Sequence, residues 1–151
     1  MQTRFREKDI RATQNAADIT EIRNLIARIA IATDIGDPGE FAELYASDAT
    51  LQMRVVPDIP PDQGLEAILA GSRKRREDGI TGPGSGLVHA IQASAVAVNG
   101  DAATSKTYVV LYRNGLTAPE LSAILIYNDA FVRAADGWRL SLRYIDPLPA
   151  G

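Results

Sequence analysis

The sequence has no cysteine and a single histidine, His89. The missing thiols exclude disulfides, cysteine nucleophiles and thiolate metal sites, and one histidine excludes a metal site with two or three histidine ligands in one subunit. No run approaches the roughly 18 apolar residues that span a bilayer, and the N-terminus lacks the apolar segment of a signal peptide. We therefore predict a cytoplasmic protein that works without a metal or other cofactor.

Charge of either sign is also modest. The chain has 151 residues, with 16 Lys and Arg against 19 Asp and Glu, for a net charge of −3. This balance argues against nucleic acid or an anionic membrane as the main partner. The length and the 46% hydrophobic content predict one domain that includes residues 1–151. Residues 1–15 are charged and show no apolar periodicity, so we expect them to form a loose N-terminal arm.

The first half of the chain predicts three helices. Asp18 and Glu21 have the spacing of a capping box, apolar residues then recur at steps of three and four, and Gly36 ends the pattern. A second helix is predicted over 37–48 and a third over 65–76, after a short strand at 49–56. Four basic residues at the end of the third helix are interpreted as a solvated helix end.

The second half predicts a sheet. A glycine-rich loop at 78–86 precedes four long segments that are rich in β-forming residues, and short turns join them. Short turns between consecutive strands indicate an antiparallel meander, so the fold class is α+β. Helices that cover one face of such a sheet leave a cavity where a small molecule can bind. The four predicted strands are 88–98, 102–113, 121–133 and 138–146.

Two residues could form a general base. His89 begins the first long strand, and histidine titrates near neutral pH. Asp34 lies on the apolar side of the first helix at its C-terminal end, where burial and the helix dipole both disfavour an unpaired carboxylate. An imidazole partner would stabilise it. The alternatives are a structural histidine at a strand end and an aspartate that turns out to water.

One predicted strand carries an unusual mixture of side chains. Tyr127, Asp129, Phe131 and Arg133 alternate along it and therefore share one face. This set suits the lining of a pocket with a few polar groups, although a solvent face with cross-strand ion pairs has the same pattern. On the following strand, Arg143 could reach the cavity or pair with an acid.

Taken in order along the chain, several segments resemble a known family. They are residues 22–50, His89 after the glycine loop, residues 98–110 and residues 127–143. Together they resemble the SnoaL-like branch of the NTF2-like superfamily, over roughly residues 16–146. This branch includes scytalone dehydratase, bile-acid 7α-dehydratase and hexachlorocyclohexane dehydrochlorinase.

The resemblance implies a cone-shaped α+β barrel, with three N-terminal helices packed on a curved antiparallel sheet and the site inside. It also implies an aspartate–histidine base, and Asp34 and His89 fall on those two positions. Arg133 falls on the arginine of the dehydrochlorinase pocket, and Asp129 on the protonated acid of related ketosteroid isomerases. These assignments are what the resemblance implies about the site.

The sequence departs from the family at two positions. Ile29 stands where the family usually has a tyrosine, or in the dehydrochlorinase a lysine, and Met53 occupies the position of the ketosteroid isomerase base. Isomerisation of a steroid by that mechanism is therefore not expected. Another group must assist the leaving group, and the available phenols are Tyr45, Tyr108, Tyr112 and Tyr127.

These observations predict a cofactor-independent lyase that eliminates water or another small leaving group from a small, apolar, cyclic or aromatic substrate. The alternatives are an isomerase or cyclase with the same dyad, and a domain that only binds small molecules. The outer face of the sheet, with Ile124, Ile126 and Val132, would be left uncovered in a monomer. We therefore expect a homo-oligomer, a trimer rather than a dimer by family resemblance.

Overall fold

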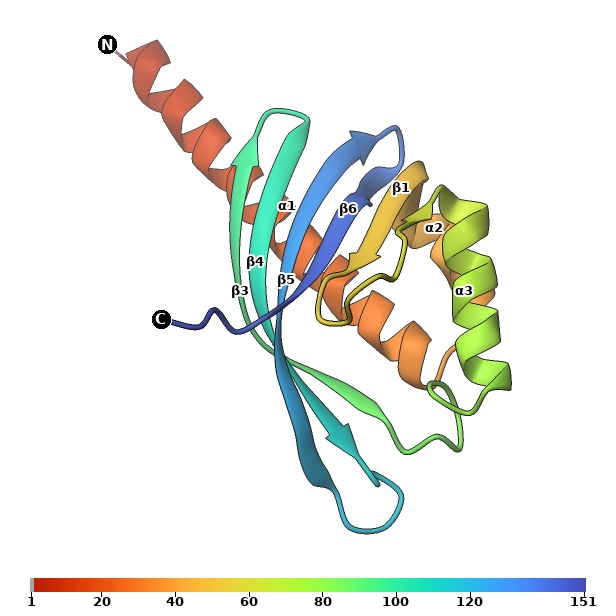
Figure 1. Cartoon of the computed structure of the whole chain (residues 1–151). Helices are drawn as coiled ribbons and strands as arrows, with labels where there is room; N and C mark the ends of the chain where they lie inside the picture. Colours follow the sequence, from red (N-terminus) through yellow and green to blue (C-terminus); the bar gives the residue numbers. More distant parts are fainter. Residues whose placement is uncertain (1) are drawn as a thin grey trace.

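The computed structural model describes residues 2–151, with side chains from residue 6 onward. Helices come first along the chain and strands dominate the second half (Figure 1). The helical elements are α1 (Gln2–Asp34), the 3-10 turn η1 (Pro38–Glu40), α2 (Phe41–Leu44) and α3 (Leu65–Glu77). The strands are β1 (Tyr45–Met53), β2 (Asp62–Gln63), β3 (Val88–Asn99), β4 (Ala102–Arg113), β5 (Glu120–Ala134) and β6 (Gly137–Pro147).

The strands form one curved sheet in the order β2-β1-β6-β5-β4-β3. The long strands β3 to β6 are antiparallel neighbours, as predicted, whereas β1 runs parallel to β6. Helix α1 crosses one face of the sheet, and α2 and α3 lie beside β1 (Figure 1). The predicted α+β class is confirmed, but the sheet stays open and is not closed into a barrel.

Helix α1 is longer than the sequence pattern predicted. It begins at Gln2 and not near Asp18, so residues 2–15 are helical and do not form a loose arm. Its sequence contains neither glycine nor proline, the two residues that interrupt helices most strongly. Residues 6–17 are nevertheless exposed, because this part of the helix extends past the sheet (Figure 1). Met1 lies outside the described residues.

The core lies between α1 and the inner face of the sheet. Ile22, Ile26 and Ile29 recur on one side of the helix and are at most 2% exposed. They belong to the same cluster as Phe131 and Trp138 on the last two strands. Each such aliphatic side chain contributes about 1.5–3 kcal/mol when fully buried. This packing fixes which face of α1, and therefore which of its carboxylates, looks into the protein.

The predicted second helix is cut short. It does begin with a capping box: the Asp37 side chain accepts from the Gly39 N–H at 2.7 Å, and the Glu40 side chain accepts from the Asp37 N–H at 2.9 Å. Only η1 and α2 follow, and β1 begins at Tyr45 because the chain there pairs with β6. The change to a strand turns the Tyr45 side chain into the core.

Two loops meet at the end of the sheet where β3 begins. The hairpin between β4 and β5 continues beyond the rest of the sheet (Figure 1). Its Gly115 N–H donates to the Gly86 carbonyl at 2.8 Å, at the end of the glycine-rich loop. A Cβ at Gly115 would lie 3.0 Å from that carbonyl oxygen, so the approach favours glycine. The contact fixes the chain just before His89.

Candidate active site

His89 and Asp34 are in direct contact. Asp34 is the last residue of α1, and His89 is the second residue of β3. One carboxylate oxygen of Asp34 lies 2.6 Å from the imidazole Nδ1, and the other accepts from the His89 backbone N–H at 2.8 Å. The predicted contact is therefore confirmed. The side chains are 14% and 12% exposed, so both are largely withdrawn from water but still reachable.

This geometry decides what the imidazole can do. A carboxylate accepts hydrogen bonds, so a neutral His89 carries its proton on Nδ1 and donates it to Asp34. The other ring nitrogen, Nε2, is then an unprotonated acceptor. Since Asp34 also accepts the backbone N–H of the same residue, the ring is held both in tautomer and in position. The arrangement is that of a general base with an orienting carboxylate.

The imidazole reaches a mostly apolar cavity of about 190 Å³ between α1, α3 and the sheet. A second hollow of about 330 Å³ lies on the outer side of the pair, and both Asp34 and His89 line it. The pair therefore lies in the wall between the two hollows. The apolar lining of the inner cavity includes Ile29, Ala30, Phe41, Leu51, Met53, Val55, Ile68, Ile80, Leu87, Leu111, Leu125 and Ile145.

Two buried phenols line the same cavity. Burial raises the pKa of Tyr127 to about 12, because the phenolate would lose its hydration, and burial also raises the pKa of Tyr45. Both phenols are therefore neutral at physiological pH. A neutral phenol can donate a hydrogen bond to a substrate oxygen, and it can also accept one.

Arg143 adds a cation to the cavity wall. Its Nε and Nη2 donate to the two Asp129 carboxylate oxygens at 2.9 and 2.7 Å, and its guanidinium lies 4.2 Å from the centre of the Tyr127 ring. Burial lowers the pKa of Arg143, but the Asp129 carboxylate more than offsets this and leaves the pKa raised. The guanidinium is thus permanently charged and held by Asp129. The sequence left two roles open for Arg143, and both are found: it lines the cavity and it pairs with an acid.

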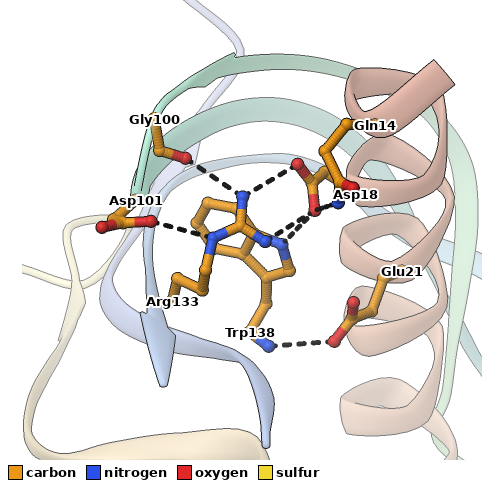
Figure 2. Close-up of polar contacts among 7 residues, drawn as sticks. All are labelled: Gln14, Asp18, Glu21, Gly100, Asp101, Arg133 and Trp138. Carbon is orange, nitrogen blue, oxygen red and sulfur yellow. Dashed lines mark hydrogen bonds and ion pairs between the residues drawn. The ribbon is translucent and has the colours of Figure 1, made fainter. Parts of the chain in front are cut away.

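Arg133 lies elsewhere, so the role implied for it by the family resemblance is wrong. It donates two bonds to Asp18 on α1, at 2.8 and 2.9 Å, and a third to Asp101 at 3.0 Å, and it lies over the Trp138 ring (Figure 2). None of these residues lines the cavity that contains His89. Asp18 is correspondingly not a helix cap, because α1 passes through it without interruption.

The remaining predicted site residues divide in the same way. Tyr45, Tyr127 and Met53 line the cavity, and Asp129 stands behind Arg143. Tyr108 does not belong to the site: it is 51% exposed on the outer face of β4, whose inward residues include Thr107 and Val109. Alternation along the strand shows which residues share a face with Tyr108. It does not show whether that face is the inner or the outer one, which depends on how the strand pairs with its neighbours.

Sequence reasoning missed a polar wall on α3 and the loop after it. Ser72, Arg75 and Thr81 line the cavity, although the basic run was interpreted as solvated. The Thr81 hydroxyl oxygen is buried without a hydrogen-bond partner. A helical projection of α3 could have found this wall, since Ser72 and Arg75 follow Ile68 at steps of four and three.

No group of three or more side chains that could hold a metal ion occurs among the described residues. Within the same part of the chain, no helix is both long and apolar enough to cross a membrane.

The fold is similar to that of several solved structures. A structure from Novosphingobium aromaticivorans, described as NTF2-like with a cystatin-like fold, is similar over 94% of this chain and 89% of its own, with 24% identity and a TM-score of 0.73. ActVI-ORFA from Streptomyces coelicolor is similar over 84% and 94%, with 19% identity and a TM-score of 0.68. Likenesses at this level of identity show the fold alone.

The family is shown by the sequence itself. A model of the SnoaL-like domain matches residues 14–144, so the chain belongs to the SnoaL-like domain family within the NTF2-like fold. A candidate dehydratase of the NTF2-like family from Streptomyces avermitilis has a similar structure, over 89% of this chain and 99% of its own, with 15% identity and a TM-score of 0.72. The sequence matches no curated protein at a significant level.

Proposed function

We propose that the protein is a cofactor-independent lyase in which His89 is the general base. The observation that carries this proposal is the contact of 2.6 Å between Asp34 and the imidazole Nδ1, in the wall of a cavity that the same imidazole lines. Membership in a family with dehydratases, cyclases and isomerases among its members supports an enzyme. The same base would serve an isomerase or cyclase, and elimination is favoured here by the likeness to a candidate dehydratase of the same fold.

The reaction begins with proton abstraction. Nε2 of His89 takes a proton from a substrate carbon next to an activating group, and Asp34 stabilises the imidazolium that forms. The electron pair of the broken C–H bond forms a new double bond, and the leaving group departs with the electrons of its own bond. If the leaving group is hydroxide, the proton on His89 converts it to water and restores the neutral base.

Developing negative charge needs donors on the other side of the substrate. Tyr45 and Tyr127 are protonated phenols in the same cavity, and Arg143 is a buried cation held there by Asp129. Donors that are fixed before the reaction stabilise an oxyanion at little cost of reorganisation. In this proposal they take the place of the family tyrosine or lysine, because Ile29 supplies no polar group.

The cavity indicates the kind of substrate. Its lining is mainly aliphatic, and the charge of its most buried cation is already balanced by Asp129. An uncharged, small, cyclic or aromatic molecule with a carbonyl or hydroxyl oxygen fits this environment best, because an additional charge would lose its hydration without gaining a counter-ion.

The experiment that tests the proposal is turnover of a panel of small cyclic β-hydroxyketones, with product masses measured by mass spectrometry. A lyase yields products lighter by one molecule of water, and His89→Ala abolishes the loss. Tyr108→Phe, on the outer face of the sheet, is the matched control and should keep full activity. Products of unchanged mass would instead support an isomerase or cyclase. Ligand binding without turnover, unaffected by His89→Ala, would support a binding domain.

We also propose that the chain self-associates through the outer face of the sheet. Of the three residues expected on this face, Ile124 and Val132 are each 39% exposed, whereas Ile126 is buried, so the expectation was wrong for Ile126. Tyr108 is exposed on the same face, beside a groove of about 480 Å³. A large uncovered apolar face usually marks an interface. Light scattering at micromolar concentration should give the mass of a trimer or dimer, and Ile124→Lys should lower it. A monomeric mass for the unmodified chain would contradict the proposal.

A further inference from the structure

The basic run at the end of α3 is not uniformly solvated. Arg73 and Lys74 are exposed, whereas Arg75 and Arg76 are half-buried. Nη2 of Arg76 donates to the Ala32 carbonyl at 2.6 Å and to the Thr33 carbonyl at 3.2 Å. These are the two residues immediately before Asp34. A side chain of α3 is thus bonded to the last turn of α1, the turn that carries the carboxylate of the base.

Arg76 also contacts the glycine-rich loop before His89. A Cβ placed at Gly82 would lie 2.9 Å from Cγ of Arg76 and 3.2 Å from its Cδ. Among the described side chains, no carboxylate lies within 4.0 Å of Arg76, and its Nε is buried without a hydrogen-bond partner. The guanidinium is therefore directed at helix carbonyls and is not neutralised by an ion pair.

These contacts place one cation between three segments that must keep their positions for the pair to work. The last carbonyls of a helix have no partners within the helix and carry partial negative charge. Asp34 adds a full negative charge at the same end. Without a cation the turn would be repelled by its own carboxylate and would fray, and the carboxylate would leave the imidazole.

We infer that Arg76 is a positioning residue for the Asp34–His89 pair: it fixes the last turn of α1 so that Asp34 holds His89 in the Nδ1–H tautomer. The inference rests on the proposed role of His89 as a base with a free Nε2. It assigns to Arg76 an indirect role, because Arg76 does not itself line the cavity and its hydrogen bonds go to the Ala32 and Thr33 carbonyls and not to the imidazole. The other charged or titratable groups facing the cavity are Arg75, Tyr45, Tyr127 and the Arg143–Asp129 pair.

The single histidine makes a direct test possible without a substrate. Nitrogen-15 chemical shifts of the imidazole distinguish the two neutral tautomers, and every signal belongs to His89. In the unmodified protein, at a pH high enough that the imidazole signals no longer change with pH, we expect the Nδ1–H form. In Arg76→Met the Nδ1–H form should lose its majority, since an imidazole without a fixed acceptor reverts to the mixture found in water.

Arg73→Met is the matched control, because it removes the same charge from the same helix at an exposed position. Its imidazole should stay in the Nδ1–H form. Arg76→Lys should also keep this form, because an ammonium group can still bond the last carbonyls of a helix. Retention of the Nδ1–H form in a folded Arg76→Met protein would overturn the inference, as would equal loss in Arg73→Met.

Two glycines of the loop provide a second pair of variants, which decides the matter if Arg76→Met does not fold. Gly82 and Gly84 both have a φ of +87°, so alanine introduces the same backbone strain at each. A Cβ at Gly82 would displace Arg76, whereas a Cβ at Gly84 meets no atom within 4 Å. Gly82→Ala should therefore disturb the tautomer and Gly84→Ala should not; an identical response in both would overturn the inference.

Failure of this inference can be told apart from failure of the proposed function. If the unmodified protein has the Nδ1–H form and Arg76→Met keeps it, only the role of Arg76 is wrong. If the unmodified protein already has the Nε2–H form, the base itself is misassigned, and both proposals fail.

Discussion

Helix α1 carries two buried or half-buried aspartates that each accept several hydrogen bonds, yet their surroundings differ. Asp18 accepts two bonds from Arg133 and one from the Trp138 indole at 3.0 Å (Figure 2). Asp34 accepts the backbone N–H and faces the imidazole of His89. A guanidinium stays charged at every accessible pH, whereas an imidazole gains and loses its proton near neutrality. The Arg133–Asp18 pair can therefore only stabilise the fold, whereas the Asp34–His89 pair can also transfer a proton.

The spaces around the two pairs differ in the same sense. Trp138, which lies against the Arg133–Asp18 pair, is 1% exposed and belongs to the packed core. The Asp34–His89 pair lies between two hollows. The Arg133–Asp18 ion pair attaches α1 to the packed sheet, while the Asp34–His89 pair beside an apolar cavity has room for a substrate. Charge and burial alone would not have separated the two pairs; the partner of each aspartate and the cavity beside His89 do.

The largest expected effect concerns the reacting pair. His89→Ala should lower kcat/KM by about 10²–10⁴-fold, the range that general-base catalysis contributes. Its Tm should fall only modestly, because Asp34 loses the imidazole but keeps the hydrogen bond from the backbone N–H of residue 89. Steady-state kinetics and thermal melts on the same preparations check this. Activity within a few-fold of the unmodified enzyme would remove His89 from the mechanism.

The Arg133–Asp18 pair should show the reverse pattern, with the larger effect on stability. Asp18→Asn replaces a carboxylate acceptor by an amide whose NH₂ group faces the guanidinium, and the indole loses a charged partner. We expect a loss of about 2 kcal/mol in the free energy of unfolding. Urea unfolding measures this, with Asp136→Asn, on an exposed carboxylate of the same protein, as the control. An unchanged midpoint for Asp18→Asn would contradict the comparison.

The two pairs should also separate in pH. The hydrogen bonds from Arg133 are the main cause that lowers the pKa of Asp18 to about 2, below its ordinary value of 3.8. A carboxyl whose pKa is lowered by folding stabilises the fold fully above its unfolded pKa, and this contribution disappears as the pH falls from about 4 to about 2. Urea unfolding across that range should show the loss, and Asp18→Asn should reduce it.

Activity and the fold should respond to acidification through different groups. Only the neutral imidazole accepts a proton, so kcat/KM should rise with pH as the Asp34–His89 pair loses a proton. The loss of activity in acid then reports the Asp34–His89 pair, whereas the loss of stability in acid reports Asp18. Coincidence of the two losses would mean that activity merely follows unfolding.

The smallest expected effect concerns the phenols. Tyr127→Phe removes one donor from the cavity and keeps the ring that packs against Arg143. The loss of one neutral hydrogen bond in the transition state, about 1 kcal/mol, corresponds to roughly a fivefold fall in kcat. Unchanged kcat in Tyr127→Phe and in Tyr45→Phe would exclude both phenols as donors to the substrate.

Patterns with a strong local cause could be predicted from the sequence. The alternation of β-forming residues predicted β3 to β6 to within one residue at every end, and the amphipathic pattern predicted α3. Asp34 was recognised because a carboxylate on the apolar side of a helix end requires a partner. The likeness to a family supplied His89 as that partner, and the contact is present.

The predictions that were wrong concern residues whose partners lie far away in the sequence. Asp18 and Glu21 have the spacing of a capping box, but the same two carboxylates accept bonds from Arg133 and Trp138 across the core. Alternation showed that Arg133 shares a face with Tyr127, but not that it lies at the other end of that face. The same limit explains Arg76: its charge suggested solvent, and only the meeting of α3 with α1 gives it acceptors.

The measurement that tests the central claim most directly is a double-mutant cycle in kcat/KM with His89→Ala and Asp34→Asn. Residues that act as one unit lose their effect together, so the double variant should be no slower than His89→Ala alone. A loss equal to the product of the two single losses would show that the residues act independently, and would contradict the assignment of Asp34–His89 as the catalytic pair.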